Sequence, residues 1–459
     1  MIELTLLFGA MLFGNFLRRT IRPLRNSLIP SSVIAGFLLL AVNGVYKKLA
    51  GVSMFSNITL ETMTYHCLGL GFVALALKSS QRNRERKARV DVFNTGVTVV
   101  STYLLQALVG LSITLGLSYV LSSWASAGLL LPMGYGQGPG QAYNWGNVYE
   151  SATAYPAFTN GASFGLTVAA MGFVSASVGG VIYLSFLKAK NRLKGPVANA
   201  QEIEDLSAEM ITQKGEIPIS ESLDKFTVQF GLVFLTYMVG YLIMHFSSLG
   251  LDRLGGFFSG TVKPLVWGFN FLIGTLCALL FKFLLRWWKQ AGFLKRAYTN
   301  DFMLSRVAGV MFDVMVTASI AAIDLSAFKE PSFVLPLVLV CVLGAVATYA
   351  YINHVAKRTF PDYADESFLM LYGMLTGTAS TGVILLREID PLFQTPAANN
   401  LIYQQLWAIV FGFPMLLLLG VSPQSTGWTW FTLGCLVILF VVMNLILFRK
   451  RIFGKNKQA

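Results

Sequence analysis

Two glycine-rich segments interrupt the apolar sequence, and their residue types suit the binding of a small solute. The first is LLLPMGYGQGPGQAYNWG, residues 129–146, which contains Gly134, Gly136, Gly138, Pro139 and Gly140. This composition breaks a helix, because glycine destabilises helices and proline lacks a backbone N–H donor. At membrane depth, protein or water must satisfy the freed amides and carbonyls. The segment therefore predicts a re-entrant hairpin whose tip binds a ligand, although an exposed surface loop is the alternative.

The second segment is FLMLYGMLTGTASTGVIL, residues 368–385, in which glycines alternate with Thr376, Thr378, Ser380 and Thr381. Hydroxyls and bare carbonyls suit a small alkali cation, which takes hard oxygen ligands, and they can also hold a carboxylate or an ammonium group. A small-residue packing face has a similar composition. The matching position of the two segments in their halves of the chain favours a second re-entrant hairpin.

Asp313 lies inside an apolar stretch, in the sequence GVMFDVMVTAS. A carboxylate within a membrane span is costly and marks a functional site by default. Asp313 is therefore a candidate sodium ligand or proton carrier, with a structural acid bonded to a neighbouring helix as the alternative. Thr317 follows one turn later, and a single hydroxyl there is usually helix-packing glue. The three histidines lack metal-ligand spacing, so we expect no transition-metal site.

The elements that carry these residues are membrane helices. The chain has 459 residues, of which 55% are hydrophobic and 12% charged, against about 25% charged in soluble domains. The net charge of +13 comes from Lys and Arg in short tracts between apolar runs, where they orient spans. We therefore expect an all-α integral membrane protein in a lipid bilayer, and no nucleic-acid partner.

Apolar runs long enough, or nearly so, to cross a bilayer recur eleven times. We predict spans at residues 2–17, 28–45, 63–77, 97–121, 164–187, 226–246, 265–285, 307–323, 333–352, 401–419 and 428–448. The first run has no basic leader before it, so we interpret it as a retained span and not as a signal peptide.

Basic residues predict how these spans are oriented. Clusters follow the first, third, fifth, seventh and ninth spans and occupy the C-terminus, while Lys47 and Lys48 are the main exception. Cytoplasmic loops retain Lys and Arg. We therefore expect a multi-pass protein of the plasma (inner) membrane, with its N-terminus outside and its C-terminus in the cytoplasm.

A polar, acidic stretch at residues 191–225 divides the chain near its middle and is predicted to be a cytoplasmic linker. Five spans on each side place the two halves in inverted orientations, an arrangement that forms binding sites near the bilayer midplane. The predicted units are a first inverted repeat at 1–190 with hairpin 129–146, and a second at 226–420 with hairpin 368–385. An extra transmembrane helix and basic tail occupy 421–459.

Over residues 1 to about 420, and best around the hairpins, the sequence resembles the sodium/glutamate symporter family. The first hairpin of that family reads Gly-Gly-His-Gly-Thr-Gly-Ala, and Gly136, Gly138 and Gly140 fit it, with Gln137 in place of the His and Pro139 in place of the Thr. The second reads Gly-Phe-Gly-Leu-Gly-Ala-Thr-Pro-Thr-Ala, which Gly373, Gly377 and Thr381 match, with Ser380 in place of the Pro. Glu150 and the run Phe158, Thr159, Asn160 resemble a further family segment.

The resemblance implies a homodimeric symporter that couples Na⁺ to substrate entry by alternating access. It places substrate at the two tips, namely Gly136, Gln137, Gly138, Gly140, Gln141, Thr376, Gly377, Thr378, Ser380 and Thr381. Together with Asp313 and Thr317, which lie within a predicted span, Thr159 and Asn160 are the candidate cation ligands. The residues that differ from the family sit at both tips. We therefore expect a small carboxylate or amino acid, glutamate-like, without specifying glutamate.

Three other functions are compatible with parts of the sequence. A proton-coupled carrier of an organic anion would use the same hairpins, and a channel would line its pathway with them. A membrane-embedded enzyme would need a convergent set of catalytic groups, and the sequence has only isolated carboxylates. No Walker loop occurs, which argues against ATP-driven transport.

Overall fold

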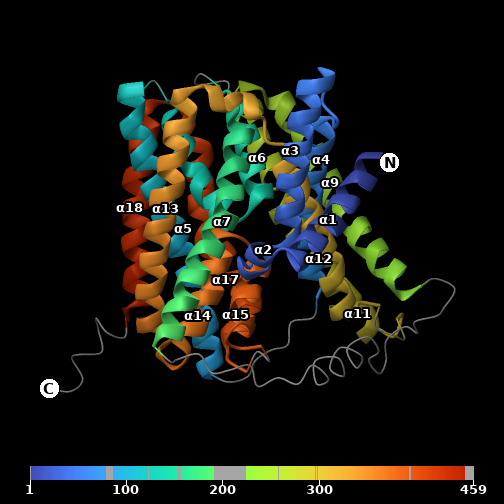
Figure 1. The fold of residues 1–459 in the computed structure, drawn as a ribbon. Coiled ribbons are helices and arrows are strands. Elements are labelled where there is room, and N and C mark those ends of the chain that lie inside the picture. Colours follow the sequence, from blue (N-terminus) through green and yellow to red (C-terminus); the bar gives the residue numbers. More distant parts are fainter. Residues whose placement is uncertain are drawn as a thin grey trace.

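The computed structural model is built from helices, most of which run side by side in one slab (Figure 1). The structure describes residues 2–78, 86–121, 123–151, 157–190, 224–256, 258–294, 296, 298–391 and 394–449. The predicted linker lies outside these residues, except for positions 224 and 225. Residues 450–459 of the predicted basic tail also lie outside the described residues.

The first half contains six long or medium helices and three short elements. The long ones are α1 (Ile2–Thr20), α3 (Ser31–Ala50), α4 (Asn57–Leu77), α5 (Arg86–Leu121), α6 (Pro139–Glu150) and α7 (Gly161–Ala189). The short ones are α2 (Arg22–Asn26), the 3₁₀ turn η1 (Ala125–Leu129) and the π-helical turn η2 (Pro132–Gly136).

The second half is also helical, with long helices separated by short elements. It contains α9 (Lys225–Leu254), η3 (Phe258–Val262), α10 (Lys263–Gly268), α11 (Asn270–Gln290), α12 (Asp301–Ala321), η4 (Leu325–Lys329) and α13 (Pro331–Thr359). After these come η5 (Pro361–Tyr363), α14 (Ala364–Thr376), α15 (Ala379–Arg387), α16 (Ala397–Tyr403), α17 (Gln405–Val421), η6 (Ser422–Gln424) and α18 (Thr426–Leu447).

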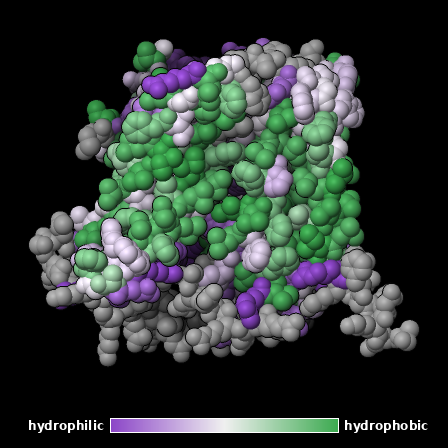
Figure 2. Space-filling model, turned by 180° about the vertical axis from the view of Figure 1, so that it is seen from behind, coloured by the Kyte–Doolittle hydropathy of each residue, from purple (hydrophilic) through white to green (hydrophobic). Residues whose placement is uncertain are grey.

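Ten helices of the described residues are long and apolar enough to cross a membrane. They correspond to ten of the eleven predicted spans. The eleventh, α1, is a helix of 19 residues that includes Glu3, Arg18 and Arg19, and these charges make it less apolar than the others. Figure 2 shows a broad apolar band on one face of the molecule, with hydrophilic residues above and below it and a hollow near its centre. The chain is therefore a multi-pass membrane protein.

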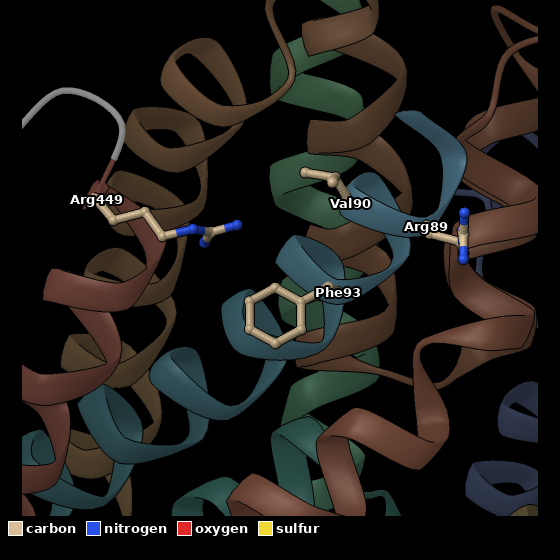
Figure 3. A pocket seen from close by; sticks show the side chains of 4 residues that line it. All are labelled: Arg89, Val90, Phe93 and Arg449. Atoms are coloured by element: carbon tan, nitrogen blue, oxygen red, sulfur yellow. The ribbon is translucent and has the colours of Figure 1, made fainter. Parts of the chain in front are cut away.

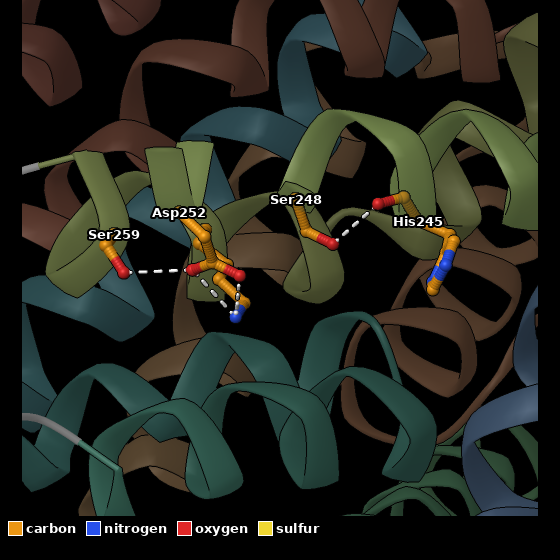
Figure 4. A network of polar contacts seen from close by, with 5 residues as sticks. His245, Ser248, Asp252 and Ser259 are labelled. Atoms are coloured by element: carbon orange, nitrogen blue, oxygen red, sulfur yellow. Dashed lines mark hydrogen bonds and ion pairs between the residues drawn. The ribbon is translucent and has the colours of Figure 1, made fainter. Parts of the chain in front are cut away.

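Local sequence signals account for several helix ends. The Asn300 side chain caps α12 by accepting a hydrogen bond from the Met303 amide at 2.9 Å, which satisfies one of the free amides of the first turn. At the end of α9, the Asp252 carboxylate accepts hydrogen bonds from Lys263 at 2.7 Å and from Ser259 at 3.0 Å. This exposed network ties α9 to the short elements η3 and α10 (Figure 4).

The long helices form two packed groups. In one group α3 packs against α1 and α12, and α4 packs against α11 and α12, while α9 packs against α11. In the other, α5 packs against α13, α17 and α18. The elements α6, α14 and α15, which carry the glycine-rich segments, lie between these groups together with α7 (Figure 1).

Several elements differ from the sequence prediction. Helix α5 begins at Arg86, before the predicted start at residue 97, because a helix can continue past the apolar run into its polar flank. The predicted span 265–285 is interrupted between α10 and α11, where Phe269 has φ −93° and ψ 20°. In the sequence, no proline or glycine cluster marks this interruption between α10 and α11.

Candidate functional site

The first glycine-rich segment forms two short helical pieces separated by a sharp break. The π-helical turn η2 ends at Gly136, and α6 begins at Pro139. Between them Gly138 has φ +88° and ψ 179°, a conformation that favours glycine because it has no Cβ. Proline then suits the first turn of α6, where no N–H donor is needed. All of these residues are buried except Gln137, which is half-buried.

The two ends of this segment lie together. The Trp124 ring, just before η1, is 4.7 Å from the Tyr149 ring at the end of α6, centroid to centroid. A Cβ atom at Gly146 would lie 2.7 Å from Cα of Ala162, so α6 packs closely on the start of α7. The chain from Trp124 to Tyr149 therefore leaves and returns to one place in the fold, with Gly138 between its two arms.

The second glycine-rich segment has the same form. Helix α14 ends at Thr376, Gly377 and Thr378 are non-helical, and α15 begins at Ala379. A Cβ atom at Gly373 would lie 2.7 Å from Cα of Gly382, so the two arms touch through glycine. The Thr376 hydroxyl donates to the carbonyl of Tyr372 within the helix.

The two breaks meet. A Cβ atom at Gly138 would lie 3.5 Å from Cγ2 of Thr378 and 4.0 Å from the carbonyl oxygen of Gly377. Because α6 starts one residue after Gly138 and α15 one residue after Thr378, two helix N-termini begin at this junction. Free amides and the helix dipole make such ends favourable places for negative charge. Beside them the hydroxyl oxygens of Thr378 and Thr381 are 3.3 Å apart.

Helix α5 contacts both segments within one turn. The Tyr103 hydroxyl donates to the carbonyl oxygen of Gly136 at 3.0 Å. The Gln106 amide Nε2 donates to the carbonyl oxygen of Leu375 at 2.8 Å and to Thr348 Oγ1 of α13 at 3.1 Å. Sequence reasoning missed these residues, although Gln106 is an amide inside an apolar span and could have been singled out. Helix α7 adds Gly172, which packs directly against the carbonyl of Thr376.

Several polar atoms near the breaks have no hydrogen-bond partner among the described residues. Gln141, in the first turn of α6, is fully buried, and both its side-chain oxygen and nitrogen are unpaired. The Gln106 oxygen Oε1 is buried and unpaired as well. Leaving a buried polar atom without a partner costs about 1–3 kcal/mol, so these amides are suited to a polar ligand or ordered water.

Asp313 lies on α12, in the group of helices that also contains α3 and α4. It is exposed on α12, and the Ser32 side chain of α3 lies near its carboxylate. One turn along α12, the buried Thr317 hydroxyl donates to the carbonyl oxygen of Ser32 at 3.0 Å. A carboxylate, two hydroxyls and one carbonyl thus gather where α3 crosses α12.

The remaining predicted residues lie in three places. Thr159 is exposed, and Asn160 begins α7 in the left-handed conformation with φ +63°. No contact among the described residues joins either to Asp313. Gly140 packs between α4 and α12, where its Cβ would lie 2.9 Å from Met315 Sδ, and Ser380 is exposed at the start of α15.

Comparison with known proteins gives one family. Residues 2–254, more than half of the chain, match the sodium/glutamate symporter family. No curated protein matches the chain significantly. The matched region contains the whole first glycine-rich segment and α7. The chain therefore belongs to the sodium/glutamate symporter family, a family of membrane transporters.

Proposed function

We propose that this protein is a secondary active transporter that carries a small carboxylate or amino acid, glutamate-like, together with Na⁺. The observation that supports this most is the contact between the two breaks, in which Gly138 faces Thr378. Two interrupted helices that meet inside a membrane protein are the usual setting of a transporter substrate site.

The junction supplies groups that suit a carboxylate. The first turns of α6 and α15 present backbone amides at the end of each helix that carries positive partial charge. Thr378 and Thr381 add hydroxyls, and the unpaired amide of Gln141 lies in the first turn of α6. A substrate held here would supply hydrogen-bond partners that the protein itself does not provide for these groups.

The oxygens around Ser32 fit a sodium ion. Asp313 supplies a carboxylate, Thr317 a hydroxyl and Ser32 both a hydroxyl and a carbonyl, and alkali cations prefer such hard ligands. A bound ion would add positive charge between α3 and α12. We propose Asp313, Ser32 and Thr317 as this set, and keep Thr159 and Asn160 as candidates for a separate cation contact. The Asp313 carboxylate also supports the alternative of proton coupling, because it can carry the proton itself.

The packing pattern supports two inverted repeats. The contact of α3 with α12 has its counterpart in that of α11 with α4, and α1 on α3 corresponds to α9 on α11. Each half then contributes one interrupted segment, which lies between α5 and α7 in the first half and between α13 and α17 in the second. We infer that both segments are re-entrant and enter from opposite sides. Family membership supports a homodimer, and the basic clusters support an outside N-terminus and a cytoplasmic C-terminus.

A thermal-shift screen of the purified protein tests the proposal. We expect one or more amino acids or dicarboxylates to raise the melting temperature in NaCl but not in KCl, because binding to the folded state alone stabilises it. Equal stabilisation in both salts, with a dependence on pH, would instead favour the proton-coupled carrier.

A further inference from the structure

A cavity of about 340 Å³ opens at one end of the slab, between the first turns of α5 and the end of α18. Arg89, Val90 and Phe93 of α5 line it together with Arg449, which follows α18. In Figure 3 the Arg449 side chain reaches towards α5, and Arg89 lies on the far side of Val90. This is the end of the helices that the distribution of cations assigns to the cytoplasm.

The guanidinium of Arg449 is held in place. One of its nitrogens, Nη1, donates to the Asn94 side chain at 3.2 Å and to the carbonyl oxygen of Ile446 at 2.7 Å. Its charged carbon lies 5.1 Å from the centre of the Phe93 ring, which attracts a cation. Because arginine has five N–H donors, the group keeps donors for a ligand.

No acidic residue is among the four described residues that line the cavity. Among the described residues, neither Arg89 nor Arg449 forms an ion pair. The acid nearest in sequence, Asp91, accepts a hydrogen bond from the Tyr363 hydroxyl at 2.9 Å and does not line the cavity. The cavity is therefore suited to an anion.

Apolar surface continues from the cavity along the slab. The Phe93 ring packs edge-on against Trp407 of α17, with centroids 5.0 Å apart. Exposed apolar side chains extend along the two helices that flank α5, namely Leu406 and Val410 on α17, and Val442 and Leu445 on α18. A ligand with one negatively charged end and a long apolar part would fill the cavity and cover these exposed apolar side chains.

We propose that this cavity binds the phosphate headgroup of an anionic phospholipid, with an acyl chain along α17 or α18. Basic pockets between membrane helices on the cytoplasmic side bind such headgroups. The exposed apolar side chains on α17 and α18 favour a lipid over a free phosphate, since a free phosphate would leave them uncovered.

Native mass spectrometry of the full-length protein in detergent tests this site. We expect retained phosphatidylglycerol but little phosphatidylcholine. The double variant Arg89→Gln/Arg449→Gln should bind phosphatidylglycerol about thirtyfold more weakly, if each arginine contributes as basic residues near anionic membranes do. The matched control is Arg286→Gln/Lys289→Gln, which removes two exposed charges near the end of α11 and should bind as the wild type does.

Two further measurements keep the test decisive. Val90→Phe fills the cavity while keeping both charges, and it should weaken phosphatidylglycerol retention while leaving the melting temperature in detergent unchanged. Inorganic phosphate at millimolar concentration should not displace the lipid. Equal loss in the two double variants, equal retention of phosphatidylcholine, or displacement by phosphate alone would overturn the proposal.

Discussion

At the scale of single residues, Gly138 has two constraints. Its φ of +88° disfavours any residue with a Cβ atom, and its α-carbon faces Thr378 across the junction. A β-branched side chain is the least tolerated there. We therefore expect Gly138→Val to abolish uptake while the protein still inserts, measured as initial uptake per molecule at the cell surface.

The matched control for this change is Gly309→Val on α12, where an added Cβ meets no atom within 4 Å. It should leave uptake close to normal, because surface substitutions usually stay within about 0.5 kcal/mol. Near wild-type flux in Gly138→Val would remove the first segment from the binding site.

Asp313 carries the second prediction at this scale. Replacing it with Asn keeps the shape of the side chain but removes the charge that attracts a cation. We expect Asp313→Asn to raise the sodium concentration for half-maximal uptake about tenfold, which corresponds to about 1.4 kcal/mol, with little change in protein abundance. Sodium activation identical to that of the wild type would make Asp313 a structural residue.

At the scale of elements, α5 connects both breaks through Tyr103 and Gln106. Replacing Gln106 with Leu removes the donor to the carbonyl of Leu375, and an unpaired buried carbonyl costs about 1–3 kcal/mol. We expect Gln106→Leu to lower both the melting temperature and the uptake per molecule. Thr348→Val removes only one of the two partners of Gln106 and should have the smaller effect on both. If Thr348→Val has the larger effect, α5 does not position the second break.

The sequence predicted these elements unevenly, for physical reasons. The long apolar runs and the glycine-rich breaks could be predicted, because the local amino-acid composition alone determines them. The contacts of α5 were not, since Gln106 and Leu375 are 269 positions apart and only the packed fold brings them together. The break between α10 and α11 also escaped prediction, because it is marked only by the single glycine Gly268 in an otherwise apolar run.

At the scale of the whole molecule, the orientation of the spans can be measured directly. In a background without the four native cysteines, we expect a cysteine at Ser207, which lies outside the described residues, to react with impermeant reagents only from the cytoplasm. A cysteine at the exposed Ser53, between α3 and α4, should react only from outside. The reverse labelling would invert the topology, and labelling of both positions from one side would refute the predicted number of crossings.

The family and the two segments proposed to bind substrate were accessible from the sequence, while the direct contact between their breaks was not. Gly136, Gly138 and Gly140 carried the resemblance, and the match over residues 2–254 agrees with it. That Gly138 faces Thr378 depends on the packing of two distant segments, which no single-sequence pattern specifies. The proposed substrate site uses groups at both tips, where Gln137 and Ser380 depart from the family pattern.

The most direct test of the account is uptake of labelled glutamate and related small carboxylates into proteoliposomes that contain the purified protein. We expect saturable uptake of at least one of them that follows an inward sodium gradient, persists when the proton gradient is collapsed, and is absent in Gly138→Val. Uptake that follows only a proton gradient, or that persists in Gly138→Val, would contradict sodium-coupled transport through the junction of the two breaks.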